Sequence, residues 1–68
     1  MGISDIYRRD ERRKWVRRKA VDLYDQGVRT EDLEGPDMKE YMDLLELNWI
    51  DRENLFYYLK QMEERYGV

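Results

Sequence analysis

The strongest constraint on the fold is a stripe of large apolar residues near the C-terminus. Leu55, Leu59, Met62 and Tyr66 follow one another at intervals of four, three and four residues, which places them on one face of an α-helix. The sequence contains neither the strict apolar–polar alternation of a half-buried strand nor a hairpin dipeptide. The pattern therefore predicts an all-α fold.

The first half of the chain predicts one long helix and a short helical turn. The long helix covers about residues 5–26 and ends at Gly27, a residue typical of helix C-termini. Thr30 is placed to cap a short turn that follows it, with acidic residues behind it. We therefore expect a helical turn in the first connection between helices.

Two further helices are expected in the second half. Pro36 suits the first position of a helix over about residues 36–47, and Asp51 is placed to cap a helix over about 52–66. At this length there is room for one core only. The prediction is a small three-helix domain that comprises residues 1–68.

The residue inventory excludes most catalytic chemistry. The chain has neither His nor Cys, which removes the usual general base, the activated thiol and most zinc sites. Ser4 and Thr30 are the only serine and threonine, and both are expected to act as helix caps. The glycines stand singly, and the acidic segment 22–46 lacks the alternating oxygen donors of a calcium loop. We expect no enzymatic activity, no metal and no cofactor.

The expected location is the cytoplasm, without a membrane contact. No apolar run reaches the length of a membrane span, and the first residues lack the apolar stretch of a secretory signal. Because a chain of this size has a thin stability margin and no disulfide, a second subunit is a further expectation. The chain is thus a candidate homo-oligomer.

Charge is divided unequally along the sequence. Residues 1–20 carry eight basic and three acidic groups, whereas residues 21–68 carry five basic and thirteen acidic groups. A division of this kind suits contact within the chain, head-to-tail association of copies, or a basic element that meets an external polyanion.

A basic stripe on the first helix is the first candidate binding surface. Arg8, Arg12, Trp15 and Lys19 fall within roughly 60° of one another on a helical wheel. Arginines at the core-facing positions before Val16 cannot be buried unpaired, so residues 7–14 should project past the core or lie over an acidic neighbour. Three interpretations remain open: a solvated face, phosphate binding with Trp15 stacking on bases, or contact with an acidic protein surface, including that of a second copy.

Tyr57 is the second candidate, because it points away from Leu55 on the wheel and should be exposed. Tyr and Trp are enriched at protein interfaces. Leu47 is likewise expected to fall away from the apolar face of its helix. The remaining aromatic residues are expected to join the core: Tyr24, Tyr41, Trp49, Phe56, Tyr58 and Tyr66.

One segment in the second half of the chain bears on nucleic-acid binding. The segment YMDLLELNWIDRENLFYYLKQM, residues 41–62, resembles a helix-turn-helix unit in having two helices separated by a short turn. Its second helix balances its few cations with glutamates and lacks a base-reading face. We therefore assign no family on this likeness.

These observations together predict a non-enzymatic interaction protein with a protein partner. An inhibitor, adaptor or accessory factor fits, including the small factors that phages and mobile elements encode. The alternative is a nucleic-acid-binding protein or small transcription regulator that uses the basic first helix with a degenerate helix-turn-helix.

Overall fold

The structure, a computed structural model, describes the backbone of residues 3–67 and the side chains of residues 8–67. This part of the chain is helical and contains no strand, which confirms the all-α prediction. The elements in chain order are α1 (Ile3–Asp25), the 3-10 turn η1 (Thr30–Glu34), α2 (Pro36–Leu44) and α3 (Trp49–Tyr66).

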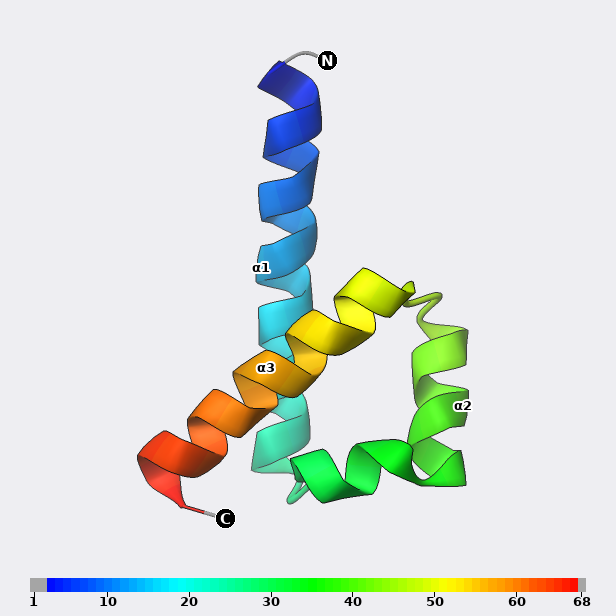
Figure 1. The fold of residues 1–68 in the computed structure, drawn as a ribbon, viewed down its shortest axis with the longest axis vertical. Coiled ribbons are helices and arrows are strands. Elements are labelled where there is room, and N and C mark those ends of the chain that lie inside the picture. The colour runs from blue at the N-terminus through cyan, green and yellow to red at the C-terminus, as the bar shows by residue number, and fades with distance from the viewer. Residues whose placement is uncertain (1–2, 68) are drawn as a thin grey trace.

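The first and last helices cross each other, and the second lies to one side (Figure 1). η1 continues from the C-terminal end of α1 and leads to α2, while the N-terminal half of α1 extends beyond α3. The radius of gyration is 12.7 Å, against roughly 11 Å for a compact domain of this length. The molecule is elongated because α1 projects past the other elements.

A single cluster of buried apolar side chains joins all four elements. Among the described side chains of α1, residues 8–25, the first buried one is Val16, where core contact was predicted to begin. Leu55 and Leu59 of α3 are completely buried and Met62 packs against them, so the stripe faces the core up to Met62, whereas its last member, Tyr66, is exposed. The cluster consists of Val16, Ala20, Leu23, Leu33, Met42, Leu47, Leu55 and Leu59.

The end of α1 follows its sequence signal. Gly27 has a φ of 91°, in the left-handed region, and its N–H donates to the carbonyl of Tyr24 while the N–H of Val28 donates to that of Leu23. This is the Schellman arrangement, which glycine favours because it has no Cβ. At the other end, α1 begins at Ile3, so Ser4 lies inside the helix, and its side chain lies outside the described residues.

The prediction that α2 continues to residue 47 is wrong. The helix ends at Leu44 in a second Schellman arrangement, in which Glu46 occupies the left-handed position with a φ of 56°. The N–H of Leu47 then donates to the carbonyl of Met42 at 3.1 Å. Because the chain reverses there, Leu47 turns into the core and is buried, although the sequence placed it on the outer side.

This unusual backbone at Glu46 predicts a stabilising substitution. A non-glycine residue in the left-handed region is unfavourable by about 1 kcal/mol, and the exposed Glu46 side chain makes no ion pair within residues 8–67. We expect Glu46→Gly to raise the free energy of unfolding by about 0.5–1 kcal/mol. Chemical denaturation measures this, with Glu46→Ala as the control that leaves the strain in place and gives no gain.

The start of α3 also differs from the prediction. Asn48 is the N-cap, and its Oδ1 accepts from the Asp51 backbone N–H at 2.8 Å. Asp51, the predicted cap, instead lies at the third helical position and accepts from the Asn48 N–H at 3.3 Å. The two residues form a reciprocal capping box, so α3 begins three residues earlier than predicted.

The prediction that Thr30 caps η1 is wrong, because Thr30 instead binds α3. It is the first residue of η1, and both its N–H, at 2.7 Å, and its hydroxyl donate to the buried carboxylate of Glu63 on α3. At the N-cap of η1 stands Arg29, whose N–H donates to the Asp32 carboxylate at 3.0 Å. The η1 turn is therefore fixed by an acceptor that lies 33 residues away in sequence.

Candidate interaction surfaces

Arg12, a predicted binding residue, forms an internal ion pair with Asp51. Its Nε and Nη2 donate to Asp51 Oδ2 at 3.0 and 2.8 Å, and Nη2 also lies 3.4 Å from the carbonyl oxygen of Glu46. The side chain of Asp51 is only 4% exposed, whereas that of Arg12 is 44% exposed. A buried carboxylate needs such a partner. Arg12 thus links α1 to the end of α2 and to the capping box of α3.

Trp15 and Lys19 are drawn into the same structural cluster. The Arg12 guanidinium lies 4.5 Å from the centroid of the Trp15 ring and the Lys19 ammonium 5.6 Å from it, both within cation–π range. Trp15 is half-buried and packs against the core. Of the predicted stripe, the structure therefore brings three members together in a brace, and Arg8 alone lies outside it, exposed.

Six other cations of α1 are exposed and make no ion pair within residues 8–67. They lie on several sides of the helix, so this part of α1 is cationic around most of its circumference. Its N-terminal members stand on the segment that projects past the core, as predicted (Figure 1). We call these six the basic arm: Arg8, Arg9, Arg13, Lys14, Arg17 and Arg18.

The outward side of α3 carries four exposed apolar side chains, in two pairs that lie seven residues apart. Trp49 is 69% exposed and Phe56 50%, so the prediction that they belong to the core is wrong. Tyr57 is 57% exposed, as predicted, and its hydroxyl accepts from Gln61 Nε2 at 2.8 Å. Seven residues correspond to two turns of helix, about 10 Å. This surface is the outer face of α3: Trp49, Ile50, Phe56 and Tyr57.

Tyr57 makes its aromatic contact within α3, with Tyr58, whose ring centroid lies 5.7 Å away. Of the other aromatic residues predicted in the core, three are half-buried against it, and Tyr66 is exposed in the last turn of α3. The half-buried three are Tyr24, Tyr41 and Tyr58.

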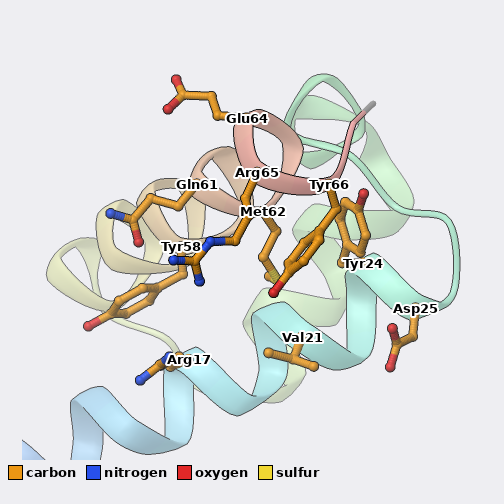
Figure 2. A pocket seen from close by; sticks show the side chains of 10 residues that line it. All are labelled: Arg17, Val21, Tyr24, Asp25, Tyr58, Gln61, Met62, Glu64, Arg65 and Tyr66. Atoms are coloured by element: carbon orange, nitrogen blue, oxygen red, sulfur yellow. The ribbon is translucent and has the colours of Figure 1, made fainter.

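A groove of about 800 Å³ runs between α1 and the C-terminal half of α3. Its aromatic part includes Tyr24 and Tyr66, whose ring centroids are 6.2 Å apart (Figure 2). Arg17 and Val21 of α1 line the opposite wall from Arg65, which reaches toward α1. The sequence did not indicate this groove, because it depends on how α1 and α3 cross.

One tyrosine has a pKa that its surroundings raise. Burial, with a smaller contribution from the charge of Asp22, raises the pKa of the Tyr41 hydroxyl above its usual value near 10. Tyr41 is half-buried and packs beside the core.

Neither a metal centre nor a membrane span is found among the residues that the structure describes. No group of three or more carboxylates gathers there in a way that could hold an ion. No helix in this part combines the length and the apolar character that a bilayer crossing needs.

The exposed position of Trp49 had a signal in the sequence that the prediction missed. Asn48 and Asp51 stand at capping-box spacing, and a helix that begins after Asn48 places Trp49 two turns from Phe56 on one side. The buried role of Asp51 had no such signal, because it requires the distant Arg12.

Comparison with known proteins gives no relative: no family model matches the chain, and no curated protein or solved structure is significantly similar to it.

Proposed function

We propose that this protein is a non-enzymatic interaction module that binds a protein partner through the outer face of α3. The observation that carries the proposal is the exposure of four large apolar side chains on one helix surface. Large apolar side chains that are exposed together on one helix face are typical of protein contact sites, and here the exposed Glu53 lies between the two pairs.

The composition of the outer face suits a binding surface. Trp and Tyr dominate the energetics of protein interfaces, because their large rings lose little conformational entropy on binding. Trp49 is the most exposed of the four, and covering such a ring contributes about 1.5–3 kcal/mol. Trp49 and Phe56 stand seven residues apart, which is two helical turns. Side chains at this spacing are those that a helix inserts into the groove of a partner protein.

The accessible surface area of the molecule also supports a protein partner. It amounts to 5470 Å², whereas a folded monomer of this mass has roughly 4,700 Å². The difference, roughly 800 Å², is about the area that one partner contributes to a standard protein–protein interface. Part of this excess belongs to the projecting segment of α1 and part to the outer face of α3.

The basic arm favours nucleic acid as a second candidate. Its cations lack internal partners within the described residues, and an α-helix fits the width of the duplex major groove. However, the rest of the chain is strongly acidic, which opposes approach to a phosphate backbone. The outer face of α3, by contrast, has no role in phosphate contact. We therefore rank the protein partner first.

Capture from the source organism with three immobilised full-length baits tests the proposal. The baits are the unaltered protein, Trp49→Ala/Phe56→Ala, and Arg8→Gln/Arg13→Gln, and each extract is treated with nuclease beforehand. We expect the unaltered bait and the arginine variant to retain the same protein and the Trp49/Phe56 variant to lose it. With the purified partner, that variant should bind at least about 30-fold more weakly, since hot-spot truncations are each unfavourable by about 1 kcal/mol or more.

The altered side chains are all exposed, so the melting temperatures of the three baits should agree. The proposal is contradicted if the Trp49/Phe56 variant still retains the partner. Retention that depends on Arg8 and Arg13, or that nuclease abolishes, would instead establish the nucleic-acid candidate.

A further inference from the structure

The groove between α1 and α3 has two cationic residues at its walls and an apolar floor. Arg17 and Arg65 line it, and neither forms an ion pair within residues 8–67. Figure 2 shows Arg65 directed toward α1, and the carboxylates of Asp25 and Glu64 also belong to the groove lining. Between the arginines and Tyr66 lie Val21 and Met62, which provide the apolar lining.

A complementary surface is present on α2 of the same chain. Leu44 is 77% exposed, the most exposed large apolar side chain in the described part. Asp37 and Glu40 lie seven and four residues before it and are exposed, so the three share one side of α2. Neither carboxylate forms an ion pair within residues 8–67. We call this surface the acidic face of α2: Asp37, Glu40 and Leu44.

The two surfaces also match in spacing. Arg17 and Val21 are four residues apart on α1, and Glu40 and Leu44 are four residues apart on α2. One helical turn, roughly 6 Å, separates the charged group from the apolar group on each side. When Leu44 lies against Val21, Glu40 therefore comes within reach of Arg17, with Arg65 available to a second carboxylate.

The acidic face cannot occupy the groove of its own chain. In Figure 1, α2 lies on one side of α1, and the C-terminal half of α3, which forms the groove, extends to the other. We propose that the groove between α1 and α3 binds the acidic face of α2 from a second copy of the chain. Each chain offers both a groove and an acidic face, so head-to-tail repetition of this contact generates rings or open chains.

This contact goes beyond the proposed function, because it leaves the outer face of α3 free. The acidic face of α2 offers three side chains to the groove, which is far fewer than the roughly 20–30 residues a side of a standard interface, so the contact is weak. We therefore expect association in the range of about 10 µM to 1 mM, stronger at low salt because two ion pairs form across it.

Sedimentation equilibrium on two exposed-site variants tests the proposal. Val21→Glu introduces a negative charge into the groove, and Leu44→Glu removes the apolar group of the acidic face. The unaltered chain should show an average mass that rises with concentration beyond two chains, while each variant alone should remain monomeric. An equal mixture of the variants retains one intact groove and one intact acidic face. It should therefore form a complex of two chains and nothing larger.

The rescue by mixing also shows that both variants are folded, and Phe56→Glu serves as the control for the outer face of α3. We expect Phe56→Glu to associate like the unaltered chain. A strictly monomeric unaltered chain up to about 1 mM, a mixture that stays monomeric, or association that Val21→Glu and Leu44→Glu leave intact would each overturn the proposal. Loss of association in Phe56→Glu would do so as well, by assigning the contact to the outer face. Partner capture through Trp49 and Phe56 is unaffected by any of these results.

Discussion

Replacement of Leu59 by alanine is expected to lower the free energy of unfolding by about 2–5 kcal/mol. Leu59 of α3 is completely buried and is one of the eight apolar side chains that are buried within residues 8–67. With so few neighbours to relax into the space, the truncated site is left with a cavity. Met42→Ala should have an effect of the same order, because Met42 is the buried contact that α2 itself contributes.

Leu44→Ala provides the matched control, since it removes the same atoms from an exposed position. Its effect should stay within about 0.5 kcal/mol. Urea denaturation followed by circular dichroism measures all three variants. A loss below about 0.5 kcal/mol for both Leu59→Ala and Met42→Ala would remove these residues from the core.

The second large effect is expected at Arg12. Arg12→Gln removes two charged hydrogen bonds from the buried Asp51 carboxylate, which then retains the Asn48 N–H as a donor. We expect a loss of about 1–3 kcal/mol in the free energy of unfolding. At Arg12 the structure shows contact within the chain, one of the possibilities that the division of charge left open.

Arg13→Gln is the control for this prediction, because Arg13 is the next residue along the chain and the substitution removes the same charge. The Arg13 side chain is exposed and makes no ion pair within residues 8–67. Its effect should be within about 0.5 kcal/mol. A double-mutant cycle with Asp51→Asn isolates the coupling between the two groups. Equal stabilities of the Arg12 and Arg13 variants, or a coupling energy near zero, would show that the ion pair does not hold α1 to α3.

The sequence predicted the helices well where local chemistry decides them. Gly27 and Pro36 mark a helix end and a helix start because their backbone preferences are intrinsic. It failed where a distant contact decides. Glu46 adopts a left-handed conformation that no glycine in the sequence indicates. The turn at Glu46 buries Leu47, and the Glu46 carbonyl accepts a hydrogen bond from Arg12.

The candidate surfaces show the same division. The exposure of Tyr57 follows from helical periodicity alone and is confirmed. The burial of Asp51, and with it the internal role of Arg12, requires that α1 and α3 be placed in space. The groove likewise could not be predicted from local sequence, because Arg17 and Arg65 line one groove only as a result of how their helices cross.

A brace in the middle of the basic helix narrows the functional alternatives. Arg12, Trp15 and Lys19 form one packed cluster, so the charges available for an external partner lie on the basic arm. Under the proposed function, that arm would contribute long-range attraction and a fast association rate, and the outer face of α3 would contribute the apolar contact area.

Calorimetric titration of the captured and purified partner, at several temperatures and at two salt concentrations, tests the central claim most directly. Binding through the outer face of α3 buries apolar surface, so the account predicts a clearly negative heat-capacity change. It also predicts a Kd that changes less than about threefold between 50 and 200 mM salt. A heat-capacity change near zero, together with a loss of affinity of about 10³-fold over the same salt range, would mean that the basic arm carries the binding, and would contradict the account.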